Sequence, residues 1–294
     1  MSLEITEKRR DPFAFIDLAR LGRNDFWSYV RGILWIAFFY ALVTAAAIYI
    51  LRSLDHTNGP SMFVRMVLLF LSTYGLFIGV DHAAQRTHGR PALSLVSIDL
   101  RLDYRRLLLG AAIWLGIDVI LVIVDLVTSN AHVAPWNPSW PLFVVGAIVM
   151  VPIQAAGEEL VFRGYLTQAL GQVIRNRGLV ALIVAIPFAA LHGTYHGSLS
   201  LPFYVLTSLF LSVVTLRDQR LELAIGIHAA QNIAGVVLEG SPDPRLTFPA
   251  LVQSNSVEVS ATDLAGLLAG AAVFFAVAFS LLERDRRLAA KARG

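Results

Sequence analysis

Two adjacent glutamates and an arginine interrupt an otherwise apolar run in the stretch AGEELVFRGYL, which covers residues 156–166. Successive helical residues are about 100° apart, so Glu158 and Glu159 are not expected to aim at one target. Glu159 and Arg163 are four residues apart, in the order that favours an ion pair on one helix face. Glu158 is left without a local partner, and a carboxylate in an apolar setting suits a general base working near neutral pH. Gly157 would let another backbone or a substrate come close.

Two later runs carry functional residue types at a four-residue spacing, which places each pair on one face of a helix. Phe188 and His192 form the first pair, and His228 and Asn232 form the second. If these faces turn inward, Glu158 meets two histidines. A glutamate beside two histidines can activate water for hydrolysis, either with a bound metal or by acid–base chemistry alone. Asn232 can donate a hydrogen bond to a developing oxyanion.

The elements that must position these residues are membrane helices. The chain has 294 residues, of which 56% are hydrophobic and 15% charged, and its mean hydropathy is +0.64. Soluble domains carry about 25% charged residues. Eight apolar segments approach the length that crosses a hydrocarbon core of roughly 30 Å. They cover residues 33–51, 62–80, 107–127, 140–165, 179–195, 201–217, 221–239 and 263–282. We therefore expect an all-α polytopic membrane bundle with about eight transmembrane helices.

The positive charges predict the orientation of these helices. With the N-terminus in the cytoplasm, 19 of the 24 Lys and Arg residues fall in cytoplasmic segments and three on the opposite side. The positive-inside rule then predicts that both termini are cytoplasmic. The small net charge of +3 fits anchoring at that face, with no nucleic-acid partner. Only two of these basic residues are lysines, which is typical of a GC-rich bacterial genome, so we expect a bacterial inner (plasma) membrane protein.

The chain is expected to form one membrane domain with two flanking segments. Near the N-terminus, Asp11 and Pro12 read as the start of a short interfacial amphipathic helix with Phe13, Ile16 and Leu21 on its apolar face. The predicted divisions are a cytoplasmic or interfacial segment at 1–30, a membrane-embedded domain at 31–283 with its motif core at 140–240, and a basic cytoplasmic tail at 284–294.

Three short motifs resemble those of a known family. EELVFR at 158–163 resembles the EExxxR motif of the CPBP intramembrane proteases, which include the type II CAAX prenyl endopeptidases and bacteriocin-processing proteins. FAALH at 188–192 is similar to the family's FxxxH motif, and HAAQN at 228–232 to its HxxxN motif. The motifs occur in the family's order, each in its own predicted span. The resemblance covers roughly residues 140–240 and extends to an eight-span architecture.

This resemblance implies an intramembrane endopeptidase that cuts a membrane-associated peptide or protein. It implies that Glu158 is the water-activating base, that His192 and His228 bind water, metal or the oxyanion, and that Asn232 donates to the oxyanion or substrate. The residues implied in supporting roles are Glu159, Arg163 and Phe188.

Members of this family are described as metalloproteases, so zinc is a candidate cofactor. The chain has no cysteine, which excludes thiolate zinc sites, disulfides and cysteine nucleophiles. Glu158, His192 and His228 could bind zinc and leave one position open. A Glu158 that binds zinc is less available as a base, so zinc-assisted and direct hydrolysis both stay open.

Two other functions remain open. A noncatalytic binding or immunity protein could use the same scaffold. Missing motif residues would favour that function, but every motif position here is filled. Asp118 and Asp125 are seven residues apart on one helix face, a pattern that is compatible with a transporter or a proton relay. We prefer the interpretation that these two aspartates form a helix contact in the outer half of the membrane or line a water-filled vestibule, because no basic partner for them lies in a predicted span. His196 is expected in an outer loop. No role is expected for four histidines in loops, His56, His82, His88 and His132.

Overall fold

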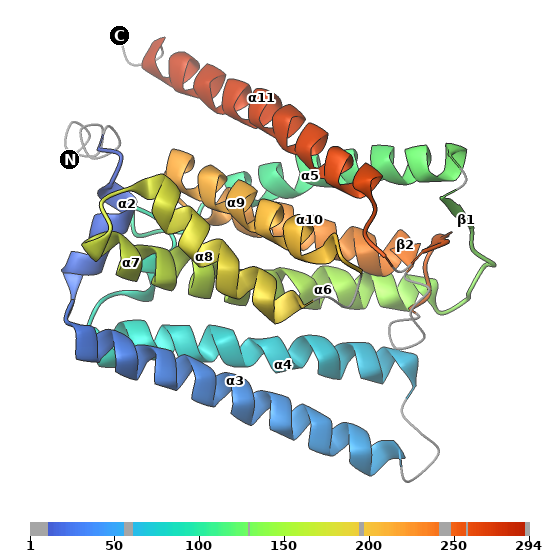
Figure 1. The fold of residues 1–294 in the computed structure, drawn as a ribbon, viewed down its shortest axis with the longest axis horizontal. Helices are drawn as coiled ribbons and strands as arrows, with labels where there is room; N and C mark the ends of the chain where they lie inside the picture. Colours follow the sequence, from blue (N-terminus) through green and yellow to red (C-terminus); the bar gives the residue numbers. More distant parts are fainter. Residues whose placement is uncertain are drawn as a thin grey trace.

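The computed structural model describes residues 11–55, 61–128, 130–193, 197–240, 248–256 and 258–291, which form a bundle of long helices with one small sheet (Figure 1). The predicted all-α polytopic bundle is confirmed. Its main helices are α3 (Phe26–Asp55), α4 (Met62–His82), α5 (Tyr104–Val127), α6 (Trp140–Glu159), α7 (Thr167–Val173), α8 (Arg177–His192), α9 (Ser200–Asp218), α10 (Glu222–Val237) and α11 (Ala261–Lys291).

Within the described ranges, six helical segments are long and apolar enough to cross a membrane. They are α3, α4, α5, the continuous helix from α6 through α7, α9 and α11. The other two predicted spans correspond to α8 and α10, which have 16 residues each. Sixteen helical residues extend about 24 Å, which is less than a hydrocarbon core of roughly 30 Å. The expected count of eight complete spans therefore stays a prediction.

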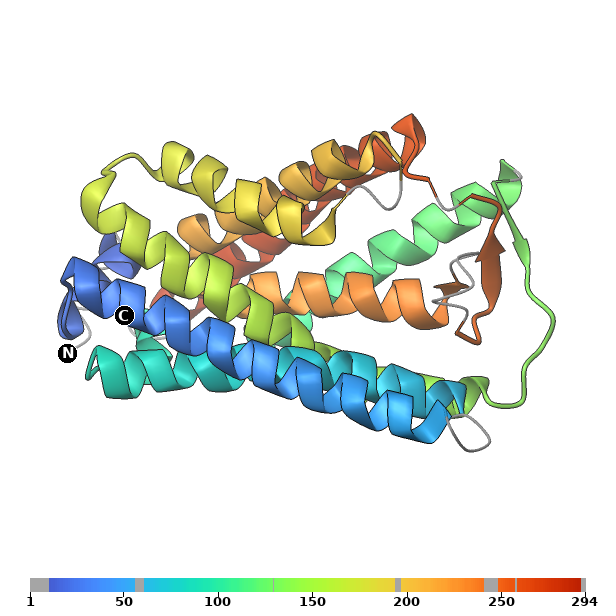
Figure 2. The ribbon, with the colours of Figure 1, turned by 60° about the horizontal axis from the view of Figure 1, so that its bottom comes forward.

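Helix α10 lies at the centre of the bundle, in contact with α5 on one side and α6 on the other. Eleven of its sixteen residues are buried. A helix that is covered on all sides by protein is apolar around most of its circumference. The remaining helices form outer pairs, with α3 against α4 and α8 against α9 (Figures 1 and 2).

Two glycines bring the backbones of α5 and α10 into close contact. A Cβ atom on Gly226 would lie 2.1 Å from the carbonyl oxygen of Leu107, and one on Gly110 would lie 2.6 Å from that of Leu223. No side chain can occupy either position without moving a helix. Gly157 of α6 allows a looser approach, since its Cβ would lie 3.3 Å from the carbonyl oxygen of Thr73 in α4.

The helix that carries the two glutamates changes its winding directly after them. Helix α6 ends at Glu159, a π-helical segment η4 extends over Leu160–Leu166, and α7 continues from Thr167. The wider turn is visible in the backbone, where the Thr167 N–H donates to the carbonyl of Phe162, five residues earlier. Thr167 Oγ1 donates to the same carbonyl at 2.9 Å. Such π segments are rare and occur frequently at functional sites.

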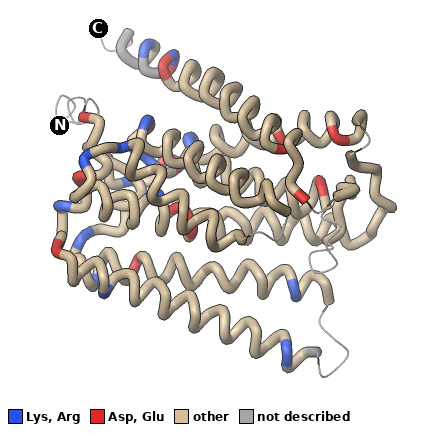
Figure 3. The backbone as a smooth tube through the Cα atoms, in the orientation of Figure 1, with Lys and Arg blue, Asp and Glu red and all other residues tan. Residues whose placement is uncertain are grey.

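Buried ion pairs tie together the helix ends nearest the termini. Arg106 of α5 pairs with Asp218 at the end of α9, and Arg220 pairs with Asp99 and with Glu222 at the start of α10. Lys and Arg residues gather at this end of the bundle (Figure 3). Arg106 and Arg220 were counted as charges at the membrane surface, but they are 9% and 4% exposed and belong to the protein interior. The predicted cytoplasmic location of the termini stays a prediction.

The N-terminal segment packs more deeply than an interfacial helix would. Asp11 Oδ1 accepts a hydrogen bond of 2.8 Å from the backbone N–H of Phe13, as expected of a cap. The helix that follows, α2 (Ala14–Asp17), continues as a 3-10 turn, η1 (Leu18–Leu21). Phe15 and Ile16 are fully buried. The Phe15 N–H donates to Gln219 Oε1 at 2.7 Å, so this segment is anchored on the end of α9.

The opposite end of the bundle carries a three-stranded sheet of order β1-β3-β2 (Figures 1 and 2). Strand β1 (Ala131–Val133) pairs antiparallel with β3 (Val252–Ser254), and β2 (Glu239–Gly240) pairs parallel with β3. In the register, Ala131 lies opposite Ser254 and Glu239 opposite Val252. The sheet joins the end of α10 to the segments that precede α6 and α11.

Two of the histidines expected in loops lie in secondary structure. His82 is the last residue of α4, and His132 lies in β1. His88 lies in the loop between η2 (Ala83–Thr87) and η3 (Ala92–Leu95), as expected, but it is only 1% exposed, and its Nε2 lies 2.8 Å from the hydroxyl of Tyr165 in the π segment. The predictions for His56, His196 and the two ends of the chain (residues 1–10 and 292–294) lie outside the described residues.

Gly110→Ala should destabilise the protein, because the new methyl group meets the α10 backbone and the overpacking costs about 1–3 kcal/mol. Gly116→Ala, on the same helix, is the control, since a Cβ there has no heavy atom within 4 Å. It should leave stability unchanged or raise it by about 0.5–1 kcal/mol, the usual difference between Gly and Ala in a helix. Thermal unfolding of both variants in detergent measures this, and equal melting temperatures would contradict the close contact.

Candidate active site

The polar residues of the three motifs lie where α6, its π extension, α8 and α10 meet. Glu158 and Glu159 are the last two residues of α6, and Arg163 lies in the π segment. His192 is the last residue of α8. His228 lies in the buried central part of α10, and Asn232 follows it one turn later. Three helices therefore contribute to one polar region inside an apolar bundle.

The ion pair predicted between Glu159 and Arg163 is present. Arg163 Nη1 donates to Glu159 Oε1 at 2.8 Å, and both side chains are fully buried. The guanidinium also lies over the Phe188 ring, with 4.3 Å between its carbon and the ring centroid. Glu159 Oε1 is in turn 2.8 Å from Nδ1 of His228. One carboxylate oxygen therefore connects the π segment to α10.

Glu158 has one fixed oxygen and one open oxygen. Its Oε1 accepts a hydrogen bond of 2.6 Å from Nε2 of Gln154, one turn earlier on α6. Gln154 Oε1 accepts from Nδ2 of Asn232 at 2.9 Å, so α10 orients this amide. Glu158 Oε2 is buried and has no hydrogen-bond partner within the described residues. It lies 3.7 Å from His228 Nε2.

The two glutamates reach one side chain, so the expectation that they cannot share a target was wrong. Glu159 contacts Nδ1 of His228, and Glu158 approaches Nε2 of the same ring. An imidazole has two nitrogens on different edges, so two carboxylates that diverge from neighbouring helix positions can flank it. The expectation that Glu158 lacks a local partner was also wrong, because Gln154 is bound to it.

The contact with Glu159 sets the orientation of the His228 ring. A carboxylate accepts, so Nδ1 carries the proton and donates it to Glu159. Nε2 is then the ring nitrogen directed at Glu158 Oε2, and the two atoms lie 3.7 Å apart. The acidic partner thus binds one ring nitrogen of His228 and thereby fixes the direction of the other, which is the nitrogen available for reaction.

His192 lies beside this centre without a direct polar contact to it. Its Nδ1 donates to the backbone carbonyl of Phe188 at 2.8 Å, and its Nε2 has no hydrogen-bond partner among the described residues. Among described residues, His192 has no hydrogen bond or ion pair with Glu158 or His228. It is connected through Phe188, whose ring centroid is 4.5 Å from that of His192 and 6.2 Å from that of His228. Tyr204 of α9 stacks on its other face at 4.3 Å.

Two residues of the site were missed by the sequence reasoning. Gln154 could have been found, because it is a polar residue inside the predicted span 140–165 and precedes Glu158 by four positions, on the same helix face. Tyr204 gave no usable signal, since a tyrosine near the start of an apolar helix is ordinary. Only the packing of α9 against α8 brings it to His192.

The side chains do not form a three-ligand metal centre as they are arranged. Across the described ranges, no three His, Asp or Glu side chains lie close enough together to hold a metal ion. His228 Nδ1 is committed to Glu159, and His192 lies apart from Glu158. Zinc ligated by Glu158, His192 and His228 stays a prediction of the sequence.

Comparison with known proteins agrees with the resemblance in the motifs. Residues 137–234 match the family described as type II CAAX prenyl endopeptidase Rce1-like, a range that includes Glu158, Arg163, His192, His228 and Asn232. The chain is also 25% identical over 231 residues to the uncharacterized protein YyaK of Bacillus subtilis (strain 168), across 72% of this chain and 77% of that protein. The matched segment thus links the site to a family of membrane endopeptidases, which are hydrolases.

Glu158→Gln and Glu159→Gln should have different effects on stability, and only Glu159→Gln should destabilise the protein. Loss of the Glu159 charge leaves a buried arginine without its ionic partner, and breaking such a pair costs about 3–5 kcal/mol. Glu158 has an unpaired buried oxygen, so its neutral isostere should match or exceed the wild type in stability. Thermal unfolding in detergent compares the two variants. A Glu158→Gln protein that melts as low as Glu159→Gln would mean that Glu158 is a structural residue.

Proposed function

We propose that this protein is an intramembrane endopeptidase that hydrolyses a peptide bond of a membrane-associated substrate with a water molecule activated by Glu158. One observation carries the proposal. Among the described residues, the buried Glu158 Oε2 has no hydrogen-bond partner, and it lies 3.7 Å from Nε2 of His228, whose Nδ1 is bound by Glu159. A buried acceptor without a partner is costly and needs a functional reason.

The proposed reaction uses Glu158 as both base and acid. A water molecule hydrogen-bonded to Glu158 Oε2 and His228 Nε2 gives its proton to Glu158, and its oxygen bonds to the carbonyl carbon of the substrate. The carbon–nitrogen bond then breaks, and Glu158 returns the proton to the leaving amine. Every transferred proton is accounted for by these groups and the substrate.

The remaining side chains hold this pair in place. Glu159 fixes the ring of His228, and Arg163 balances the charge of Glu159 in the apolar interior. Gln154 orients Glu158, with Asn232 bound to its other end. His192 borders the site through Phe188, and its Nε2 can contact the substrate. In the neutral ring Nε2 accepts a hydrogen bond, whereas in the protonated ring it donates one and would stabilise the developing oxyanion.

A lipid-modified substrate of the CAAX type is the proposed class. The matched family supports it. So does an apolar cavity of about 210 Å³ between α4, α5, α6 and α10. Its wall includes Ala156 and Leu160, which precede and follow the glutamates on α6. Part of an isoprenoid chain would find an apolar surface there, next to the proposed catalytic carboxylate.

The proposal is tested by cleavage of fluorogenic peptides with the purified protein in liposomes. We expect the wild type to cut a prenylated CAAX-type peptide faster than its unprenylated counterpart, and Glu158→Gln to remove activity while the protein stays folded. A chelator is added in parallel, and the zinc content of the wild type and of His192→Ala is measured by mass spectrometry. Specific binding of the prenylated peptide without cleavage would favour the noncatalytic binding protein.

The hydrogen bonds among Asn232, Gln154 and Glu158 predict non-additive effects on kcat. If Asn232 acts by orienting Gln154, each single alanine variant should lower kcat about tenfold or more and leave KM nearly unchanged. The double variant should then be no slower than the slower single variant, because residues in one network do not add.

Gln172→Ala is the control for this cycle, because Gln172 binds Arg20 and the backbone of Ile16, away from Glu158. It should leave kcat unchanged. Rates that multiply in the double variant would instead mean that Asn232 contacts the substrate directly, as an oxyanion donor would.

A further inference from the structure

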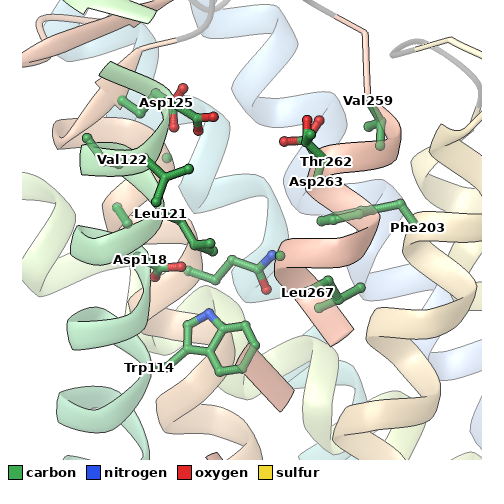
Figure 4. A pocket seen from close by; sticks show the side chains of 16 residues that line it. Trp114, Asp118, Leu121, Val122, Asp125, Phe203, Val259, Thr262, Asp263 and Leu267 are labelled. Atoms are coloured by element: carbon green, nitrogen blue, oxygen red, sulfur yellow. The ribbon is translucent and has the colours of Figure 1, made fainter. Parts of the chain in front are cut away.

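A second pocket lies in the half of the bundle that carries the sheet, between α5, α10 and α11 (Figure 4). Its volume is about 270 Å³. Four carboxylates line it: Asp118 and Asp125 from α5, Glu239 from β2 and Asp263 from α11. This is where the sequence predicted a vestibule beside Asp118 and Asp125, and β2 and α11 supply two further acidic residues.

The described lining of this pocket contains no basic side chain. A neighbouring pocket of about 180 Å³ shares Asp125, Glu239 and Asp263 with it and adds Glu258, again without Lys, Arg or His among the described residues. The hydrogen bonds that hold Asp125 and Asp263 come from neutral groups, the Asn130 amide and Ser260. The charge of these carboxylates is therefore not balanced by the residues that line the two pockets.

Two unpartnered polar atoms point to a ligand on the inner side of the pocket. Trp114 is 2% exposed, and its Nε1 has no hydrogen-bond partner among the described residues. Figure 4 shows the indole nitrogen turned toward the interior of the pocket, on the same side as Asp118. Asp118 Oδ2 is also buried without a partner. Trp114 and Asp118 thus place a buried donor and a buried acceptor one helical turn apart, and neither has a hydrogen-bond partner among the described residues.

Apart from the uncharged polar side chains of Gln231 and Thr262, the rest of the lining is apolar. Leu121, Phe203 and Leu267 lie between the carboxylates (Figure 4). The carboxylates do not converge on one point, since no three of the described acidic and histidine side chains could share a metal ion. An occupant must therefore bring its positive charge together with an apolar body. An unbalanced charge on low-dielectric walls attracts such a cation strongly.

We propose that this pocket binds an organic cation, namely a protonated amine on a short apolar stem. The ammonium group donates to Asp118 and to the carboxylates near the sheet, while the stem lies against Leu121, Phe203 and Leu267. The Trp114 N–H donates to a hydroxyl or carbonyl oxygen of the ligand, or to a water molecule that accompanies it. A free amine and the lysine side chain of a peptide share this chemistry.

The pocket is separate from the proposed active site, although α10 borders both. Gln231 lines the pocket, whereas its neighbour Asn232 bonds to Gln154 in the catalytic cluster. The neighbouring residues Phe203 and Tyr204 also belong to different sites, since Phe203 lines the pocket and Tyr204 stacks on His192. Binding in the pocket can therefore be measured without any reference to proteolysis.

Isothermal titration of the purified protein in a nonionic detergent tests the proposal, with hexylammonium as the probe and hexanol as its uncharged match. We expect saturable binding of hexylammonium and weaker binding of hexanol. Asp118→Asn should weaken hexylammonium binding by about tenfold or more, the usual scale for one charge-assisted hydrogen bond. Glu283→Gln removes an exposed charge near the other end of α11 and should change nothing.

Trp114→Phe gives a second test that keeps the aromatic wall and removes only the N–H. It should leave hexylammonium binding nearly intact and weaken binding of 6-amino-1-hexanol, which carries a hydroxyl. A short peptide with one lysine, compared with its alanine version, distinguishes a peptide side chain from a free amine as the source of the cation. Equal binding of hexanol and hexylammonium, or unchanged binding in Asp118→Asn, would overturn the proposal.

The affinity should also depend on pH. Burial, followed by the charges of Asp125 and Asp263, raises the pKa of Glu239, which lies beyond the end of α10, to about 7. The amine stays protonated up to about pH 10, so only the protein titrates near neutrality. Glu239 is neutral below its pKa and charged above it, and hexylammonium binding should strengthen from pH 6 to pH 8. In Glu239→Gln this dependence should be reduced, and an unchanged dependence would contradict the assignment.

Discussion

Glu159 and Arg163 are both excluded from solvent, so each charge is tolerated only because the other lies 2.8 Å away. An isolated charge in a medium this apolar would cost several kcal/mol or more. The pair also reaches beyond its own segment, since Glu159 binds His228 on α10 and Arg163 lies over Phe188 on α8. This ion pair therefore links three helices at the centre of the site.

The π segment and the glycine contacts make this geometry available. The π segment begins directly after Glu159, at the end of α6, and it contains Arg163. Gly110 and Gly226 let α10 lie against α5 at backbone distance, which places α10 in the middle of the bundle. A helix held in this way borders two polar regions. His228 contacts Glu159, Asn232 binds Gln154, and Gln231 lines the acidic pocket.

The two polar regions differ in how their charges are balanced. In the proposed active site, an arginine and a histidine accompany two glutamates, and four side-chain atoms of Glu158, Glu159 and Arg163 lack hydrogen-bond partners among the described residues. Such a balance lets carboxylates persist in an apolar interior, and Glu158 Oε2 is the oxygen that lies near His228 Nε2. In the pocket beside α11, the described lining supplies acidic groups and no base. The first arrangement suits a reaction that needs a held water molecule, and the second suits the binding of a cation from outside.

The sequence by itself determined the membrane bundle, the approximate positions of its long apolar helices and the Glu159–Arg163 pair, because hydropathy and i,i+4 spacing are local properties. Its motifs resemble the family that residues 137–234 match, and the roles that they imply for Glu158, His192, His228 and Asn232 stay predictions. Only the tertiary structure decided which atoms meet. The convergence of both glutamates on one imidazole, the role of Gln154 and the separation of His192 from Glu158 depend on helix contacts between residues far apart in the chain. Helix periodicity states which side of a helix a residue occupies, but the partner on that side is set by packing.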